Sequence, residues 1–251
     1  MLSIIIPCFN HEASLLRAID SAEKVRGVCE VIIVDDCSTD NSLELIQSIA
    51  AERKNIRYFC NPKNSGPGYS RNRGVHEAGG QYLAFLDADD ELINAGFYEQ
   101  AQEVIRQDPS IRAIKANMEF FDPVKGWILP DYDPRYVPAV LSSACATVIQ
   151  RDMFLRMGGF SEDVVFRGPN GGEDVAFMQA LMNCGSLGKI DVVSYRVWSK
   201  DGGHADRFLA MTRLTNSGFE FVIRGQEDSD VVERAVEEFK QMVIKRMKES
   251  E

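Results

Sequence analysis

The sequence has no long apolar run and no surplus of positive charge. None of its apolar segments approaches the roughly 20 residues that a helix needs to cross a bilayer. We therefore expect a soluble, cytoplasmic protein, with peripheral attachment to the inner face of a membrane left open. Lys and Arg total 28 against 38 Asp and Glu, a formal net charge of -10. Binding to nucleic acid is disfavoured, because no excess of cations can replace its counterions.

The cysteines lack the close spacing of a zinc site, and no secretory leader precedes them, so we expect reduced, mostly buried thiols. The chain of 251 residues, with 45% apolar and 26% charged residues, is typical of a soluble globular protein with one large domain or two packed halves. The six cysteines are Cys8, Cys29, Cys37, Cys60, Cys145 and Cys184.

Strand-like and helix-like segments alternate through the first half of the chain. A β-branched run closed by Pro7 is followed by apolar residues at helical spacing, and this unit repeats. Pro67 suits the first turn of the third helix, which Gly79 and Gly80 end. The expected strands are residues 2–6, 31–34, 55–60 and 81–86, and the expected helices are residues 12–22, 41–53 and 67–78.

Acidic residues follow two of these strands. Asp35 and Asp36 come after the second strand, and Asp87 and Asp89 come after the fourth. Because parallel β-α units wind right-handed, the acidic residues should converge at one rim of the sheet, where ligands bind in open α/β folds. Carboxylates one residue apart can hold a hard cation that keeps room for phosphate oxygens. We expect Asp87 and Asp89 to do so, with a solvated turn as the alternative.

The second half has a different pattern. Strands are expected at 111–121, 124–129 and 190–197, helices at 151–157 and 173–183, and a break at Pro130, Pro134 and Pro138. From residue 230 the tail is an amphipathic helix that should pack on the body, with a homodimer through this helix as the alternative. Its apolar stripe consists of Val232, Ala235, Val236, Phe239, Val243 and Met247.

Several ordered segments resemble the motifs of the inverting glycosyltransferases of family 2. They are residues 3–10, 31–40, 64–74, 87–90, 158–160 and 172–174, so the resemblance extends to about residue 197. It implies an α/β GT-A fold, with a Rossmann-like mixed sheet flanked by helices. It also implies a nucleotide-diphosphate sugar donor, with a UDP-linked sugar favoured, and a divalent metal ion, Mn²⁺ or Mg²⁺.

The resemblance also implies which residues bind the donor. Pro7 and Phe9 would lie against the base, and Asp36 would accept the imide N–H of a uracil-type base. The alternative for Asp35 and Asp36 is a pair of helix-capping acids. Asn10 would complete this part of the donor site.

Three further residues of the donor site follow from the resemblance. Asp87 would approach the ribose and the metal, with Ala88 beside it, and Asp89 would ligate the metal that bridges the diphosphate. Arg71 would lie close to the nucleotide, and its alternative role is an ion pair that supports Asp36 or Asp87.

The resemblance places catalysis at the start of the helix over 173–183. Asp174 would be the general base and Glu173 would orient the acceptor; alternatively both acids merely complement the helix dipole. Gly159 and Phe160 would shape the acceptor side, although a helix stop explains Gly159 equally well. His204 is expected to be a surface residue, with metal or phosphate binding as the alternative.

The sequence therefore predicts a single GT-A domain over 1–225, with a donor half (1–120) and an acceptor half (121–225), and a C-terminal helix (226–251). We expect an inverting hexosyl- or hexosaminyltransferase of glycan or polysaccharide biosynthesis, acting on a glycan, lipid-linked or other hydroxyl acceptor. Two alternatives are an inactive sugar-nucleotide-binding protein and a phospho-receiver module, although a receiver's acid pair should follow its first strand. A phosphatase with an Asp-x-Asp nucleophile fits less well.

Overall fold

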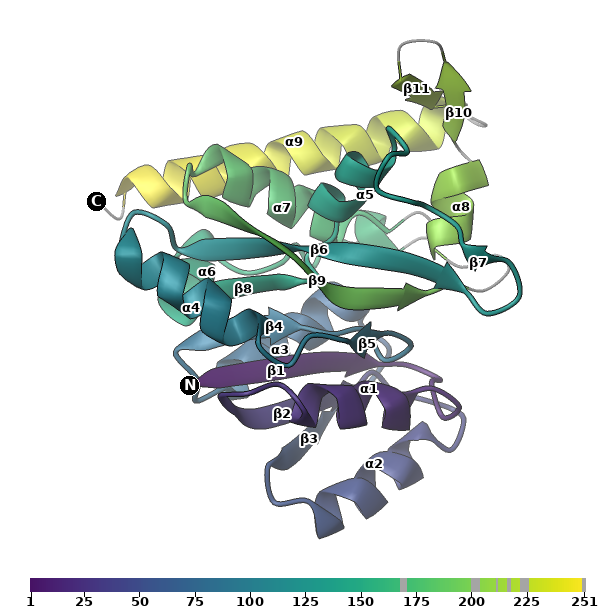
Figure 1. Cartoon of the computed structure of the whole chain (residues 1–251), viewed down its shortest axis with the longest axis vertical. Coiled ribbons are helices and arrows are strands. Elements are labelled where there is room, and N and C mark those ends of the chain that lie inside the picture. Colours follow the sequence, from purple (N-terminus) through teal and green to yellow (C-terminus); the bar gives the residue numbers. More distant parts are fainter. Residues whose placement is uncertain (168–170, 200–203, 211, 216–217, 222–225, 250–251) are drawn as a thin grey trace.

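One mixed β-sheet organises the computed structural model, which describes residues 1–167, 171–199, 204–210, 212–215, 218–221 and 226–249 (Figure 1). The strands lie in the order β3-β2-β1-β4-β8-β6-β9-β5, with β7 paired to β6 and a separate β10-β11 hairpin. The strands are β1 Leu2–Cys8, β2 Val28–Asp35, β3 Ile56–Cys60, β4 Tyr82–Phe85, β5 Glu91–Leu92, β6 Ala113–Asp122, β7 Gly126–Trp127, β8 Thr147–Gln150, β9 Leu187–Trp198, β10 Thr212–Thr215 and β11 Gly218–Phe221. The helices are α1 Leu15–Glu23, α2 Ser42–Glu52, α3 Pro67–Glu77, α4 Phe97–Gln107, α5 Tyr136–Ser142, α6 Arg151–Met157, the 3₁₀ helix η1 Val164–Arg167, α7 Glu173–Asn183, α8 His204–Ala210 and α9 Gln226–Glu249.

The first half folds as the predicted β-α units. β1 pairs in parallel with β2 and with β4, and β2 pairs in parallel with β3. The sheet becomes mixed at β8, which is antiparallel to both β4 and β6. β5, from the first half of the chain, pairs with β9 from the second half. The two halves therefore share one sheet.

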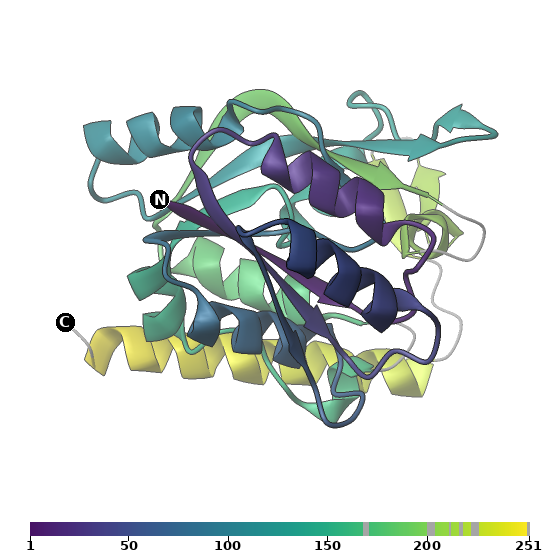
Figure 2. The same ribbon diagram turned by 90° about the horizontal axis from the view of Figure 1, so that it is seen from below.

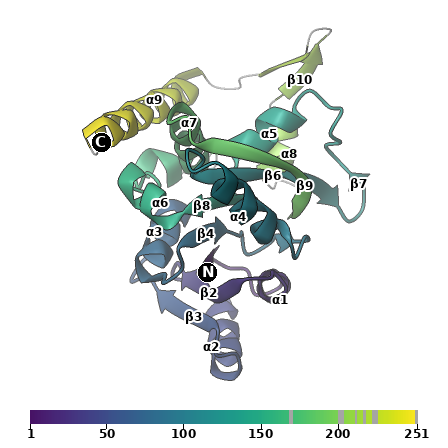
Figure 3. The ribbon, with the colours of Figure 1, turned by 60° about the vertical axis from the view of Figure 1, so that its left-hand side comes forward.

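Two apolar cores cover the two faces of this sheet. Ile4 and Ile6 of β1 lie in the first core, with residues of α1, α2, α4 and α5. Ile5 points to the second core, which contains residues of α3, α6, α7 and α9. Figures 2 and 3 show helices on both faces. Because successive strand side chains point to opposite faces, the continuous apolar run of β1 is what a strand buried on both sides requires.

The structure corrects several expected elements of the second half. The expected strand at 124–129 contracts to the two residues of β7, and the proline-rich stretch contains the short helix α5. β8, α4, β5, α8 and the β10-β11 hairpin were not predicted. α4 has apolar residues at the spacing of a surface helix, so the sequence could have predicted it. These residues are Phe97, Tyr98, Ala101 and Ile105. β8 has only four residues, which is too short for periodicity to mark.

The C-terminal helix α9 packs on the body of the protein. It contacts α6, α7 and η1, and its residues Val236, Phe239 and Val243 are buried. The stripe that suggested a dimer seam is therefore covered within the chain, and this structure gives no support to a homodimer through it. Among the described residues, no helix combines the length and apolar composition that a membrane span requires.

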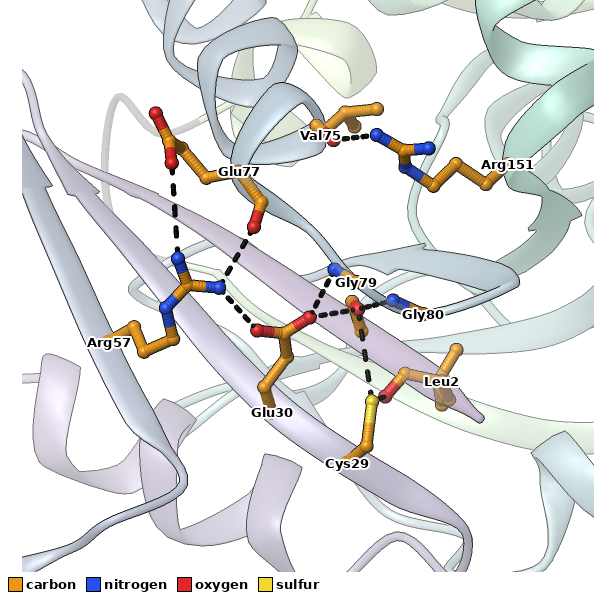
Figure 4. A network of polar contacts seen from close by, with 10 residues as sticks. Leu2, Cys29, Glu30, Arg57, Val75, Glu77, Gly79, Gly80 and Arg151 are labelled. Atoms are coloured by element: carbon orange, nitrogen blue, oxygen red, sulfur yellow. Dashed lines mark hydrogen bonds and ion pairs between the residues drawn. The ribbon is translucent and has the colours of Figure 1, made fainter.

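A buried carboxylate holds the amino-terminal ends of the central strands together (Figure 4). Glu30 accepts hydrogen bonds from the Ser3 hydroxyl (2.7 Å), the Gly79 N–H (2.7 Å) and the Arg57 guanidinium (2.7 Å). Ser3 Oγ in turn accepts from Gly80 N–H (2.9 Å), and a Cβ on Gly80 would lie 2.5 Å from this oxygen. Burial opposes the charge of Glu30, but the hydrogen bonds outweigh it and lower its pKa below the ordinary 4.5.

We predict that Glu30→Gln lowers the free energy of unfolding by about 1–3 kcal/mol, because it disturbs hydrogen bonds to a charged acceptor. A lowered folded-state pKa stabilises the protein above the unfolded pKa, and this contribution is lost as the pH falls through the folded pKa. The difference between wild type and variant should therefore narrow as the pH falls below the ordinary Glu pKa of 4.5, as measured by urea denaturation. Glu77→Gln is the control: Glu77 lies 3.9 Å from Arg57 and is exposed, so it should cost less than about 1 kcal/mol. Equal losses in both variants, or a difference that does not change with pH, would contradict this account.

Candidate active site

A cavity of about 420 Å³ lies at the carboxyl ends of β1 and β4. Both halves of the chain line it, including residues of β6, β9 and α8, which Figure 1 shows in the upper part of the molecule. The acidic and basic residues on its walls include Asp36, Arg71, Asp87, Asp89, Glu173 and Asp174. The structure therefore brings the predicted catalytic acids and the predicted metal ligands to one cavity.

The end of β1 and the loop after it contribute an apolar wall. Pro7 and Phe9 line the cavity, and Phe9 is 41% exposed. Asn10, with a φ of 59°, is directed elsewhere: its side-chain oxygen accepts from Thr39 N–H (2.7 Å), and its own N–H donates to Ser38 Oγ (3.0 Å). Asn10 thus connects the loops that follow β1 and β2.

Asp36 holds the loop that leads into α3. Its carboxylate, 3% exposed, accepts from Asn61 Nδ2 (2.6 Å), Ser65 N–H (2.9 Å) and Gly66 N–H (2.7 Å). Asp35 is also buried, and one of its oxygens accepts from Ser38 N–H (3.2 Å). Both carboxylates therefore stabilise loops at the rim, and Asp36 also faces the cavity.

A buried arginine connects the turn after β4 to α7. Arg71 Nη2 donates to Asp87 Oδ1 (2.7 Å), and its Nη1 donates to Glu173 Oε1 (2.8 Å). Its side chain is 5% exposed and lies 5.3 Å from the centre of the Phe160 ring. Burial alone would lower the pKa of Arg71, but the Asp87 and Glu173 carboxylates outweigh it and raise the pKa well above its usual range. The ion pair with Asp87, which the sequence left as an alternative, is present.

The Asp87-Ala88-Asp89 turn presents two carboxylates to the cavity. Asp87 and Asp89 are half-buried, and Ala88 between them is buried. The part of the chain that the structure describes contains no cluster of three or more His, Cys, Asp or Glu residues that could hold a metal. Two carboxylates nonetheless fit Mg²⁺ or Mn²⁺, because such ions are often held by one or two carboxylates plus substrate phosphates and water.

Asp90, which the sequence did not mark as a site residue, anchors this turn to β9. Its carboxyl oxygens accept from Tyr195 Oη (2.9 Å) and from Trp198 N–H (2.9 Å). Tyr195 Oη also accepts from Asp87 N–H at 3.0 Å. Burial, together with the neighbouring Asp89 and Asp87, raises the pKa of Asp90 well above its usual range. Tyr195 lies 105 positions from Asp90 in the chain, so no local pattern could reveal this contact.

The two acids at the start of α7 have different surroundings. Glu173 is 6% exposed and is held by Arg71. Asp174 is half-buried, and its Oδ1 accepts from Val175 N–H at 2.8 Å, as expected for an acid in the first turn of a helix. Both acids line the cavity, and Glu173 is oriented there by the arginine.

Gly159 and Phe160 lie behind the site. Gly158 ends α6 with a φ of 94°, and a Cβ on Gly159 would lie 2.4 Å from Asn72 Oδ1. Phe160, 2% exposed, supports Arg71 from beneath. This placement favours a helix stop and a supporting ring over the acceptor contact expected for these residues. His204 begins α8, and its side chain lies outside the described residues.

A buried lysine that the sequence did not reveal supports the loop before β8. Lys115 of β6 is 2% exposed, and its Nζ donates to the Ser143 carbonyl oxygen (2.8 Å) and to that of Cys145. Burial lowers the pKa of Lys115 to about 7. The amine fixes the loop between α5 and β8, whose residue Ser143 lines the cavity.

Comparison with known proteins identifies the family. The family model described as "Glycosyl transferase family 2" matches residues 3–154, which is more than half of the chain. The chain belongs to glycosyltransferase family 2. An uncharacterised glycosyltransferase of Haemophilus influenzae is 31% identical over 171 residues, 64% of this chain and 56% of that protein.

The curated relatives of this family 2 chain are longer than the segments that match it. A Campylobacter jejuni protein named GalNAc(5)-diNAcBac-PP-undecaprenol beta-1,3-glucosyltransferase is 36% identical over 95 residues, 37% of this chain and 31% of that protein. For the first four relatives, the matches cover between 15% and 38% of their lengths.

Solved structures establish the fold of this family 2 chain. S. aureus TarS 1-349 in complex with UDP-GlcNAc has a TM-score of 0.65 and 21% identity, covering 81% of this chain and 60% of that solved chain. The mannosyltransferase PcManGT from Pyrobaculum calidifontis, in complex with GDP-Man and Mn²⁺, has a TM-score of 0.61 and 17% identity over 81% of this chain and 58% of that one. The chain has the GT-A fold.

We predict that Tyr195→Phe lowers the free energy of unfolding by about 1–3 kcal/mol, because Asp87 N–H and Asp90 each lose a buried partner. Tyr98→Phe is a matched control, since the buried Tyr98 hydroxyl has no hydrogen-bond partner among the described residues. Its removal should be neutral or stabilising. Chemical denaturation measures both variants, and equal losses would show that the Tyr195 hydroxyl does not anchor the turn.

Proposed function

We propose that this protein transfers one sugar from a nucleotide-diphosphate sugar to an acceptor hydroxyl, with inversion at the anomeric carbon. The observation that carries the proposal is one cavity faced by both the Asp87-Ala88-Asp89 turn and Asp174, with Arg71 joining Asp87 to Glu173 beside it. The GT-A neighbours solved with UDP-GlcNAc, or with GDP-Man and Mn²⁺, support a donor of this class. We assign residues 1–120 to donor binding, 121–225 to acceptor binding and 226–251 to a packing helix.

The donor base is proposed to lie at the wall formed by Pro7 and Phe9. Asp36 faces the cavity, but its two oxygens already accept from Asn61 Nδ2, from Gly66 N–H and, both of them, from Ser65 N–H. A contact from the imide N–H of a uracil-type base would therefore replace or share one of these hydrogen bonds. The TarS neighbour solved with UDP-GlcNAc supports a UDP-linked hexose or hexosamine as the donor. Asn10 and Asp35 are proposed to shape this end of the site rather than contact the donor.

Asp89 and Asp87 would hold the Mn²⁺ or Mg²⁺ ion. When bound, the ion would neutralise the diphosphate of the donor and of the departing nucleotide. Because Arg71 already occupies one oxygen of Asp87, that carboxylate is fixed before any donor arrives. The chain's net charge of -10 makes such local cations necessary for a diphosphate to bind.

Asp174 is proposed as the general base that takes the proton of the attacking acceptor hydroxyl. A base on the side opposite the leaving nucleotide gives a single displacement and therefore inversion. The anomeric coupling constant of the product, measured by proton NMR, reports the configuration directly, and retention would contradict this step. Glu173 is proposed to act through Arg71, as a positioning residue, rather than on the acceptor itself.

Two other functions fit less well. A phospho-receiver module is disfavoured, because Asp35 and Asp36 follow the second strand and the family is that of glycosyltransferases. An inactive sugar-nucleotide-binding protein would need neither Asp89 nor Asp174 at the cavity, where both are found. A transferase of glycan or polysaccharide biosynthesis is the function we favour.

We predict that Asp89→Ala abolishes metal-dependent nucleotide binding. With UDP at about 100 times its Kd and saturating Mn²⁺, binding stabilises the wild type by about 2.7 kcal/mol, seen as a higher melting temperature. The variant should lose this shift. Asp131→Ala, an exposed change outside the cavity, should keep it. An unchanged Mn²⁺-dependent shift in Asp89→Ala would remove Asp89 from the proposed metal site.

We predict that Asp174→Asn keeps the nucleotide-dependent rise in melting temperature and lowers the release of UDP from its sugar conjugate about 10²–10⁴-fold, as the loss of a general base does. Asp152→Asn is the control, because Asp152 is also an acid in the first turn of a helix. If both substitutions lower the free energy of unfolding equally and neither changes the release of UDP, Asp174 only complements the helix dipole. That outcome would contradict its role as the general base.

A further inference from the structure

Trp198, at the end of β9, lines the cavity and is contacted by two arginines. The guanidinium carbon of Arg17 lies 4.5 Å from the centre of the Trp198 ring, and that of Arg196 lies 5.5 Å from it. Both distances fall within the range of about 6 Å over which a cation is attracted to an aromatic face. The Phe121 ring packs edge-on at 5.4 Å, and the indole N–H donates to Glu91 at 3.3 Å. The orientation of this ring is therefore fixed by the protein itself.

Arg17 of α1 connects this ring to the Asp87-Ala88-Asp89 turn. Its Nη2 donates to the backbone carbonyl oxygen of Asp89 at 2.6 Å. The backbone N–H of Trp198 donates to the Asp90 carboxylate at 2.9 Å, so the turn and the end of β9 are joined at two points. Arg17 is not among the residues that line the cavity. Any effect of Arg17 on a ligand in the cavity therefore passes through Asp89 or Trp198.

The surroundings of Arg17 show which contacts hold its guanidinium in place. The residue is half-buried, and among the described residues no carboxylate forms an ion pair with it. Its buried Nε has no hydrogen-bond partner there either. A buried donor without a partner opposes folding, because it has lost its contact with water. The contacts with the Asp89 carbonyl oxygen and the Trp198 ring are thus the ones that fix the guanidinium.

We propose that Arg17 is a positioning residue for the metal site, which holds the Asp89 main chain against the Trp198 ring so that the Asp89 carboxylate faces the cation. This inference rests on the proposed transferase function and names a residue outside the cavity on which that function depends. Replacing a side chain that orients a metal ligand typically lowers metal affinity about 10–100-fold. For Arg17 we expect at least about fivefold, because it contacts the main chain of the ligand rather than its carboxylate.

Calorimetric titration of the full chain with UDP measures this effect without turnover. The dissociation constant is determined with saturating Mn²⁺ and again with a chelator, and the ratio of these constants is the metal dependence of binding. Arg17→Gln removes the charge, whereas Arg17→Lys keeps a charge and a donor but lacks the planar group that stacks on the indole. Arg26→Gln is the control, because the Arg26 side chain is 61% exposed and pairs with Glu99 at 2.7 Å. Thermal unfolding is recorded for every protein.

The proposal requires Arg17→Gln to lower the metal dependence at least about fivefold, while its affinity for UDP in chelator stays within about twofold of the wild type. Arg17→Lys should lie between these proteins, and Arg26→Gln should match the wild type. An unchanged metal dependence in Arg17→Gln overturns the proposal. An equal loss of affinity with and without Mn²⁺ also overturns it, because a general disturbance of the fold has that effect.

A second variant keeps the test decisive if Arg17→Gln does not unfold cooperatively. Arg17→Lys must then lower the metal dependence at least about twofold with an unchanged affinity for UDP in chelator, and failure to do so overturns the proposal. If the wild type itself shows no Mn²⁺ dependence, the metal site of the proposed function fails and the role of Arg17 fails with it. Mn²⁺ dependence that the wild type shows and Arg17→Gln retains contradicts the role of Arg17 alone.

Discussion

The buried ion pairs of Arg71 with Asp87 and Glu173 are the interaction on which the rest of the site depends. One guanidinium joins α3, the turn after β4 and the start of α7, although Arg71 and Glu173 are 102 positions apart in the chain. Arginine suits this place because its planar group donates in two directions and stays charged when buried. Removing one member of such a buried pair typically costs about 3–5 kcal/mol, because it leaves a charge uncompensated. The same contacts set where the proposed metal ligand Asp87 and the proposed base Asp174 stand relative to each other.

Around this arginine, aromatic side chains provide packing and polar side chains provide hydrogen bonds. Phe160 closes the space beneath Arg71, and it packs on Phe85 of β4 and Phe177 of α7. Asp90 and Tyr195 hold the Asp87-Ala88-Asp89 turn, the proposed metal site, at β9. Carboxylates that face the cavity are thus backed by side chains that are themselves buried and hydrogen-bonded. Such pre-organisation is what electrostatic catalysis of group transfer requires.

The sequence predicted the β-α units as far as β4 and the convergence of Asp36, Asp87 and Asp89 at one rim of the sheet, but it missed β5 and α4. The β-branched runs of β1 and β2 and the acids beyond them predicted the parallel units and their common rim. Contacts between distant segments could not be predicted from the sequence. No local pattern around Asp90 indicates its hydrogen bond with Tyr195, and none around Lys115 indicates its hydrogen bond with the Ser143 carbonyl oxygen. The proline-rich stretch was misjudged because Pro138 fits within the first turn of the short helix α5. Gly159 and Phe160 were expected at the acceptor, and only their packing against Asn72 and Arg71 reveals a supporting position.

Calorimetric titration of the protein with UDP, in the presence and absence of Mn²⁺, tests the central claim most directly. The claim is that Asp87 and Asp89 hold a cation which binds the donor diphosphate in the cavity at the rim of the sheet. The account predicts one nucleotide bound per chain, with an affinity that falls at least about tenfold when Mn²⁺ is removed by a chelator. The absence of binding heat with UDP, GDP, CDP and TDP alike, with Mn²⁺ present, would contradict it.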